Sequence, residues 1–465
     1  MAVPEGKRRG MKGIVMCMVL SLLAGCRPAV HDAREVKAGH RFKPTSNAVI
    51  SSPVTYDWDS DGVQEIAVGS WDGYFYVLDS LLQDEPGWPK YSPKGFFSSP
   101  ALADLHALRP QGVLPAGGPP QKKRYSAGES DGLPEILVAS ETGKLYAWQA
   151  DGQDVPGFPI DLGYRLWASP TVLDGPRIAI GSLGRMFVLD ADGRPSEGWP
   201  QPIEGWPDAA AASVPGLVAV TTLTPGDPSH GWLYAWREDG TPLPGFPLPL
   251  EKDSDSSPAL ANFDGDGRWW MVFGDDAGWL HAVDQAGKER PGFPVRTAGP
   301  RPGPTPTPHP PGGNVYSIEA SPAVADLNDD GRLEIAVGSW DGRMYLWDDK
   351  GQPMPGWPVV VQDQIISSAA LVDLDGDDRL DIIVGSKDGR LYGWTVEGQA
   401  LPGFPYDLGA PVFSSPWVGD LEGDGRADIA VGANNGIHLL IDMGPLGRAP
   451  WPTFHADARR TGVAR

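Results

Sequence analysis

The sequence predicts an all-β protein, most simply a β-propeller of eight blades, each a four-stranded antiparallel sheet. With 60 Gly and 49 Pro in 465 residues, the apolar material is interrupted too often for long helices. Short apolar runs are followed repeatedly by hairpin turns. The same set of signals recurs eight times, and Gly338, Gly385 and Gly432 follow one another at intervals of 47 residues, the length of a propeller blade.

Each repeated unit reads as four short strands. An apolar triplet such as Ile335–Val337 follows a Ser-Pro dipeptide and does not alternate, as expected for a strand covered on both faces. Asp341-Gly342 then suits a tight hairpin, and Tyr345 and Trp347 alternate on the returning strand, where we expect them to pack between blades. An aromatic residue followed by Pro marks an outer edge strand, where proline costs no ladder bond. These marks are Trp88, Phe158, Trp199, Phe246, Phe293, Trp357, Phe404 and Trp451.

The chain order favours a closed ring over residues 41–465. The segment 42–52 resembles 404–415, which joins one unit to the next, so the N-terminal part is expected to supply a strand to the last unit. Seven blades or an open stack remain alternatives. Insertions at 106–129 and 298–314 break the period; their proline-rich composition predicts exposed, poorly ordered excursions.

Residues 1–25 predict a signal peptide of the lipoprotein type. Basic residues up to Lys12 precede the apolar run 14–24, which is too short to span a bilayer. The sequence Leu-Leu-Ala-Gly-Cys ending at Cys26 resembles a bacterial lipobox, which implies cleavage before Cys26, lipidation of that residue and a tether over 26–40. Because Arg27 rather than Asp follows, the resemblance implies the outer membrane or cell surface. An uncleaved anchor and a true start at Met11 are the alternatives, and the leaflet and side of the envelope stay open.

Charge and cysteine content narrow the function. The formal net charge is -22, and it becomes -25 without residues 1–25, which hold four basic residues and one acidic one. Such a surface repels nucleic acid, so no nucleic-acid partner is expected. Cys17 and Cys26 are the two cysteines. With Cys26 acylated, the exported chain has no thiol for disulfides, and its stability must come from packing or metal.

Four units carry an acidic loop before the apolar triplet, with oxygen-bearing side chains at loop positions 1, 3, 5 and 9. Such side chains surround one centre when Gly at position 6 makes a sharp turn, and about six hard oxygens suit Ca²⁺. The lack of His and Cys argues against zinc. In the third of these loops Asp378 replaces the glycine. The predicted ligands of structural calcium are Asp57, Asp59, Asp61 and Glu65 in unit 1; Asp326, Asn328, Asp330 and Glu334 in unit 6; Asp373, Asp375, Asp377 and Asp381 in unit 7; and Asp420, Glu422, Asp424 and Asp428 in unit 8.

Whether units 2 and 5 bind calcium is left open. For any single loop the alternative is an acidic turn that is exposed to solvent and binds no metal. Unit 5 has Asp264 and Asp266, but Trp270 stands at position 9. Unit 2 begins at Asp104 and resumes at Glu129 beyond the insertion, ending at Glu135.

These motifs together are similar to FG-GAP (VCBS-type) repeats, the calcium-loop propellers also found in integrin α chains. The resemblance covers residues 45 to about 442 and rests on Ser-Ser-Pro, the acidic loop and the Val-Gly-Ser-x-Asp-Gly turn. The stretch 451–462 is similar to a tag seen beside bacterial propellers. The family implies a binding or adhesion scaffold with structural calcium; units 3 and 4 depart from its pattern, so metal is not expected there.

Enzymatic signals are weak. The sequence has no Gly-x-Ser-x-Gly elbow, and its eight histidines form no close-spaced metal pair. We therefore expect a non-enzymatic scaffold that meets membrane lipid through Cys26 and binds a protein or glycan partner whose identity the sequence does not give. A quinoprotein-like or glycan-processing propeller enzyme and an outer-membrane assembly scaffold are the alternatives. Trp71 and Trp340 occupy matching turns. They either serve as exposed stacking platforms for sugars or peptides or pack against the next blade.

Overall fold

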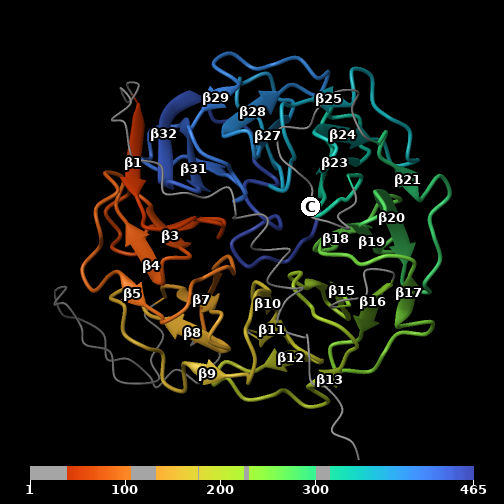
Figure 1. The fold of residues 1–465 in the computed structure, drawn as a ribbon, viewed down its shortest axis with the longest axis horizontal. Coiled ribbons are helices and arrows are strands. Elements are labelled where there is room, and N and C mark those ends of the chain that lie inside the picture. The colour runs from red at the N-terminus through yellow and green to blue at the C-terminus, as the bar shows by residue number, and fades with distance from the viewer. Residues whose placement is uncertain (1–38, 106–131, 176, 225–229, 300–314, 465) are drawn as a thin grey trace, which may run out of the picture.

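The computed structural model describes residues 39–105, 132–175, 177–224, 230–299 and 315–464. Within these ranges eight four-stranded antiparallel sheets stand radially around one centre, with no helix among them (Figure 1). The prediction of an all-β, eight-bladed propeller is confirmed, and the seven-bladed and open alternatives are wrong. Residues 1–38, with Cys26, and nearly all of both insertions lie outside the described residues. In the described part no helix is long and apolar enough to cross a membrane.

The first blade shows the pattern that the others repeat. Its inner strand β2 (Val54–Tyr56) pairs with β3 (Glu65–Gly69), β3 pairs with β4 (Tyr74–Leu78), and the short β5 (Lys90–Tyr91) forms the outer edge. All five residues of β3 are buried, as the apolar triplet predicts for a strand covered on both faces.

Units 2 to 7 form blades two to seven in the same strand order. Blades two to four consist of β6 (Ala101–Ala103), β7 (Glu135–Ala139), β8 (Lys144–Trp148) and β9 (Ile160–Asp161); β10 (Thr171–Leu173), β11 (Arg177–Ser182), β12 (Arg185–Leu189) and β13 (Gln201–Pro202); and β14 (Ala212–Val214), β15 (Leu217–Thr222), β16 (Gly231–Trp236) and β17 (Leu248–Leu250). Blades five to seven consist of β18 (Ala259–Ala261), β19 (Trp270–Gly274), β20 (Trp279–Asp284) and β21 (Val295–Arg296); β22 (Ala323–Ala325), β23 (Glu334–Gly338), β24 (Arg343–Trp347) and β25 (Val359–Val360); and β26 (Ala370–Val372), β27 (Asp381–Gly385), β28 (Arg390–Trp394) and β29 (Tyr406–Asp407).

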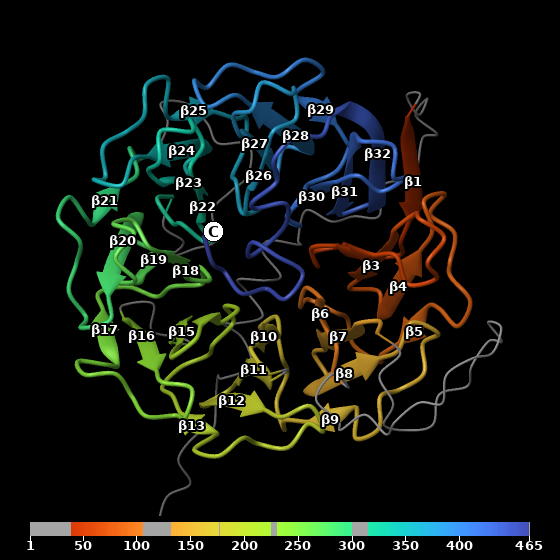
Figure 2. The same ribbon diagram turned by 180° about the vertical axis from the view of Figure 1, so that it is seen from behind.

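The eighth blade closes the ring with strands from both parts of the chain. β30 (Trp417–Gly419), β31 (Arg426–Ala433) and β32 (Gly436–Pro445) are joined at the outer edge by β1 (His40–Pro44). β1 runs antiparallel to β32, with Phe42 opposite His438. Figure 2 shows the red and blue ends of the colour scale side by side in this blade. The expected strand exchange is therefore present.

Aromatic side chains on the third strands pack between blades. Trp148 of β8 lies against Phe75 and Trp88 of the preceding blade, with ring centroids 5.3 and 5.6 Å apart. Within β24, Tyr345 and Trp347 stack on each other at 4.8 Å. Trp340 is buried, so it packs rather than serving as an exposed platform. Such contacts contribute both buried area and specific ring geometry to the interface between blades.

The recurrent Ser-Pro serines join the blades around the centre. The N–H of Ser52 donates to the Oγ of Ser99 at 2.9 Å, and the same bond links each serine to the next blade in six further places. The chain of bonds is interrupted once, between Ser169 and Ala210, because alanine has no hydroxyl to accept. This ring of bonds was not anticipated from the sequence, where Ser-Pro served only to mark units.

The C-terminal segment, residues 446–464, lies inside the ring. Backbone carbonyls of its residues accept hydrogen bonds from the inner strands of six blades, through the N–H groups of Leu371, Val418, Leu102, Val172, Ser213 and Leu260. Its Arg460 is fully buried and donates to the carbonyls of Pro100 at 2.8 Å and Pro53 at 3.1 Å. The segment thus satisfies inner edges that would otherwise present unpaired backbone groups.

Candidate calcium loops

The acidic loops connect the inner strand of a blade to its second strand. In all four predicted loops the carboxylate at position 9, the first or third residue of the second strand, accepts a hydrogen bond from the N–H at position 2. The pairs are Trp58 to Glu65 at 2.7 Å, Leu327 to Glu334 at 2.8 Å, Leu374 to Asp381 at 2.9 Å and Leu421 to Asp428 at 2.9 Å. This clasp holds the two ends of each loop together.

The carboxylate at position 1 organises the turn itself. In unit 6 both oxygens of Asp326 accept backbone N–H groups, from Asp330 at 3.1 Å and Gly331 at 2.9 Å. Asp420 does the same in unit 8 and Asp57 in unit 1. In unit 7 Asp378 takes the place of the glycine with a positive φ of 67°, so the turn forms without glycine. The loops are therefore preformed by their own backbone.

Units 1 and 7 bring carboxylates closest together. Asp57, Asp59, Asp61 and Glu65 each offer an oxygen within 4.8 Å of the others, and so do Asp373, Asp375 and Asp377. Two oxygens bound to one Ca²⁺ lie at most about 5 Å apart, since each is 2.3–2.6 Å from the ion. These two groups thus fit a calcium ion, although Asp381 does not belong to the second group.

Units 6 and 8 are looser. Among the described residues no three carboxylates of either loop meet at that spacing. In unit 6 the third position is the amide of Asn328, which donates its N–H to Asp330 at 3.4 Å. In unit 8 Glu422 forms an ion pair with Arg41 of β1 at 2.7 Å. The carboxylates of the predicted ligand sets therefore converge in unit 1, in part in unit 7, and in neither unit 6 nor unit 8.

Burial raises the pKa of the carboxyl group at position 9 in each of the four loops. It raises the pKa of Glu65 to about 7, a rise that Asp59 and Asp57 increase and the Trp58 N–H opposes. Burial likewise raises the pKa of Glu334 and of Asp381 to about 7, and it raises the pKa of Asp428. A bound cation would favour the charged form of each, so protons and cations compete for these loops.

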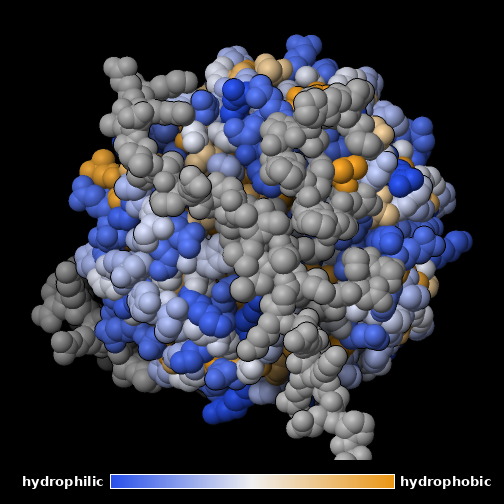
Figure 3. Space-filling model, viewed as in Figure 1, coloured by the Kyte–Doolittle hydropathy of each residue, from blue (hydrophilic) through white to orange (hydrophobic). Residues whose placement is uncertain are grey.

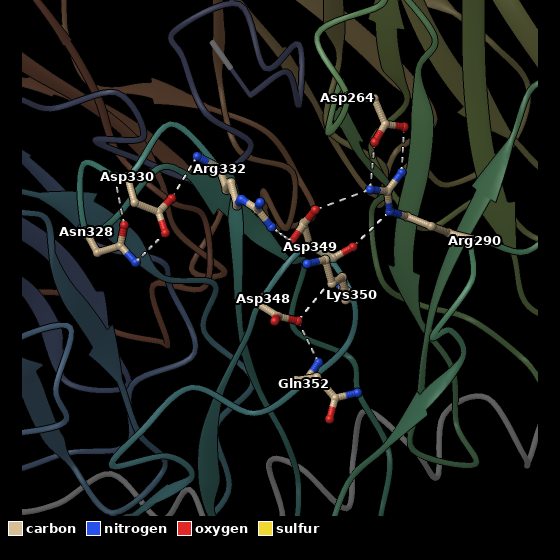
Figure 4. A network of polar contacts seen from close by, with 9 residues as sticks. All are labelled: Asp264, Arg290, Asn328, Asp330, Arg332, Asp348, Asp349, Lys350 and Gln352. Atoms are coloured by element: carbon tan, nitrogen blue, oxygen red, sulfur yellow. Dashed lines mark hydrogen bonds and ion pairs between the residues drawn. The ribbon is translucent and has the colours of Figure 1, made fainter.

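The unit 5 loop contains a cation of the protein itself. Trp270 leaves it without the ninth carboxylate, and Arg290, from the loop between β20 and β21, pairs with both oxygens of Asp264 at 2.8 and 3.0 Å. The Arg290 guanidinium also donates to the carbonyl of Asp349 at 2.8 Å, and Asp349 lies 3.8 Å from Arg332 beside the unit 6 loop (Figure 4). Arg290 accordingly lowers the pKa of Asp264. Calcium in unit 5 is thus disfavoured by a buried guanidinium.

Arg290 was missed from the sequence, although a signal was present. The corresponding residue before Pro-Gly-aromatic-Pro is Leu243, Met354 or Leu401 in other units, so an arginine there stands out. In unit 2, Glu135 accepts from the Leu105 N–H at 2.7 Å, which repeats the clasp; Glu129 and Asp131 lie outside the described residues.

One stretch of the chain matches a known family of repeats. Residues 326–384, which hold the unit 6 and unit 7 loops, match the family model described as FG-GAP-like repeat. The protein is an eight-bladed β-propeller with FG-GAP-like repeats at residues 326–384. No curated protein matches this FG-GAP propeller in sequence.

Solved structures agree on the fold of this FG-GAP propeller. Sqt1 from Saccharomyces cerevisiae is 12% identical with a TM-score of 0.60, covering 88% of this chain and 98% of its own. The computationally designed Ika8 protein is 12% identical with a TM-score of 0.54, covering 86% and 98%. BamB from Moraxella catarrhalis is 13% identical with a TM-score of 0.50, covering 83% and 95%. At these identities the likeness concerns the fold alone.

Proposed function

We propose that this FG-GAP propeller is a lipid-anchored scaffold of the cell envelope that binds or adheres to a protein or glycan partner and is stabilised by calcium. One observation carries the proposal: acidic loops recur on successive blades with the same clasp, and in unit 1 four carboxylates converge within 4.8 Å. Repeated loops of this kind suit a rigid structural frame better than a single reaction centre.

Calcium would be held by positions 1, 3, 5 and 9 of these loops. There it would neutralise carboxylates that otherwise repel one another and would tie the inner strand of a blade to its second strand. The net charge of -22 makes such counter-ions favourable for the whole molecule.

The proposed location in the cell envelope depends on lipidation of Cys26. Replacing Cys26 with Ala should leave a precursor that still carries residues 1–25, which mass spectrometry of the intact chain would reveal. A variant that is processed normally and remains membrane-bound would refute lipidation at this residue.

The surface suits a polar partner. Hydrophilic residues predominate on the face shown in Figure 3, and its hydrophobic groups are small and separated. Residues 27–465 coupled to a support should retain a component of the cell envelope when calcium is present and release it in chelator. Treating the extract with protease or with periodate distinguishes a protein from a glycan. Retention that ignores calcium would contradict the proposed coupling of metal and binding.

The enzymatic alternative has a direct test. A quinoprotein-like propeller would carry a bound quinone, which absorbs in the near ultraviolet. Purified protein with such an absorbance band would overturn the non-enzymatic scaffold.

A further inference from the structure

A cavity of about 180 Å³ lies at the centre of the ring, beside the ring of serine bonds. Each blade contributes the residue at one equivalent position to the wall. This position lies two places before the second serine of Ser-Ser-Pro, or before the residue that replaces that serine in units with a different sequence. The eight blades thus contribute one side chain each at the same level. The C-terminal segment contributes Phe454 to the lining. We call this space the central cavity.

The wall of the central cavity is divided by polarity. Five consecutive blades, seven, eight, one, two and three, contribute an apolar arc of Ile366, Phe413, Ile50, Phe97 and Trp167. The remaining three, blades four to six, contribute an acidic arc of Asp208, Asp255 and Glu319. The residue at this position varies from blade to blade while the serines beside it recur, and in the folded ring the five apolar side chains lie on consecutive blades.

The acidic arc holds carboxylates close together. Asp255, Glu319 and Asp276, from the next turn, each offer an oxygen within 4.8 Å of the others. Asp276 accepts the Ser317 hydroxyl at 2.7 Å. Asp255 makes no hydrogen bond or ion pair with any described residue. All three side chains are partly exposed, and Asp255 and Glu319 line the central cavity.

Asp208, the acidic residue that blade four contributes to the wall, already has a cation of the protein nearby. The guanidinium carbon of Arg165 lies 4.2 Å from the ring centroid of Trp167 and 4.5 Å from that of Trp206, and Arg165 lowers the pKa of Asp208 against the effect of burial. Lys252 and Lys387 act in the same sense on Asp276 and Glu319. Within the described ranges no cation counts among the causes that shift the pKa of Asp255: burial raises it most, and Glu319, Asp276 and other carboxylates raise it further.

The lining selects among ligand classes. An anion is repelled by the acidic arc. A neutral apolar molecule fits the volume, since about 150 Å³ suffices for a benzene ring, but it would leave Asp255 without a partner. A hydrated divalent ion would gain nothing from five apolar side chains. An organic cation satisfies both arcs at once.

We propose that the central cavity binds a small organic cation, with its ammonium group against Asp255 and Glu319 and its apolar body against the arc of Phe97, Phe413 and Ile50. This site is independent of the calcium loops and of the envelope scaffold proposed above. Affinity should fall as the pH drops below about 8, because Glu319, Asp208 and Asp276 take up protons with pKa values of about 8, 7 and 6. Burial also raises the pKa of Asp255, and Asp253 and Asp275 nearby add negative charge.

Benzylamine tests the proposal by calorimetric titration of residues 27–465 at pH 8 with 2 mM calcium present. We expect a dissociation constant of roughly 1 mM or tighter. The neutral analogue benzyl alcohol should bind at least about tenfold more weakly. Asp255→Asn, which keeps the side-chain shape, should weaken benzylamine by about tenfold or more, whereas Glu251→Gln at an exposed position of blade four should not.

Several outcomes would overturn the assignment. These are no binding of benzylamine, equal binding of benzyl alcohol, and an affinity unchanged in Asp255→Asn. Raising calcium from about 2 to about 10 mM should leave the benzylamine affinity unchanged. Competition by calcium that is lost in Asp255→Asn would identify the acidic arc as a metal site instead. The melting temperature of Asp255→Asn shows that the variant is folded during these titrations.

Discussion

At the scale of single residues, the same acidic loop reaches charge balance in two ways. Unit 1 gathers four carboxylates within 4.8 Å, whereas unit 5 pairs Asp264 with the guanidinium of Arg290. A bidentate pair of this kind requires no external ion. The two loops should therefore respond differently to calcium and to substitution.

Asp375→Ala and Asp264→Ala separate these two cases. Asp375→Ala should reduce the stabilisation by calcium by up to ~1.4 kcal/mol, the share of one loop if ~2 mM calcium acts on a ~0.2 mM site. Asp264→Ala should lower stability by about 1 kcal/mol or more in calcium and in chelator alike, because it removes a partner of the buried Arg290. Thermal melts in both buffers measure this; a larger calcium-dependent loss at Asp264 than at Asp375 would contradict the site assignment.

Glu319 of the acidic arc should make the stability of the protein depend on pH. Burial is the largest cause of the rise in the pKa of Glu319 to about 8. A carboxyl whose folded pKa exceeds its unfolded value binds more protons when folded, so its contribution is present at low pH and is lost as pH rises from about 4.5 to 8. Glu319→Gln should therefore stabilise the protein at pH 8 by about 1 kcal/mol or more and have little effect at pH 4. Denaturant unfolding of the wild type and of Glu319→Gln at both pH values measures this difference. A Glu319→Gln variant that is less stable than the wild type at pH 8 would refute the prediction.

At the scale of elements, the eighth blade depends on a strand from the other part of the chain. β1 pairs with β32 over five residues, and Arg41 of β1 reaches Glu422 of the unit 8 loop at 2.7 Å. This exchange fastens the ring through main-chain hydrogen bonds rather than through side chains alone.

Deleting residues 41–50 should therefore expose β32. Hydrogen exchange at 436–441 should become faster than in the intact protein, while exchange in the distant β15 should change much less. Unchanged protection at 436–441 after the deletion would contradict closure by β1.

Much of this architecture could be predicted because local signals carry it. Asp-Gly hairpins, apolar triplets and the resemblance of 42–52 to 404–415 gave the strand order and the closure. The arginine in unit 5, the serine bonds and the split wall of the central cavity could not be predicted in the same way, since each depends on which blades become neighbours in space. The looseness of unit 8 has the same origin, because Arg41 and Glu422 lie far apart in sequence.

At the scale of the whole molecule, the C-terminal segment joins the blades to one another, whereas each acidic loop braces a single blade. The segment lies inside the ring and accepts hydrogen bonds from six inner strands, while Arg460 joins blades one and two through the carbonyls of Pro53 and Pro100. In units 1, 6, 7 and 8 the loops tie the second strand of the blade to its first.

Removing residues 451–465 should lower the stability of the entire propeller rather than of one blade. Arg460→Met, which keeps much of the volume but leaves buried carbonyls without a donor, should reproduce part of the loss, by about 2 kcal/mol or more. Arg459→Met is the matched control, since Arg459 is partly exposed and pairs with Asp174 at the surface. Equal stability of the two variants would show that the buried guanidinium does not hold the ring.

The central claim, that calcium stabilises this FG-GAP propeller, is tested most directly by thermal unfolding of residues 27–465 in ~2 mM calcium and in chelator. At that concentration the two loops whose carboxylates converge, in units 1 and 7, would supply roughly 3 kcal/mol, and all four loops up to roughly 6 kcal/mol if independent, which is comparable to the net stability of a domain. We predict a large fall in melting temperature on chelation that calcium restores. The same melting temperature in both buffers would contradict the account.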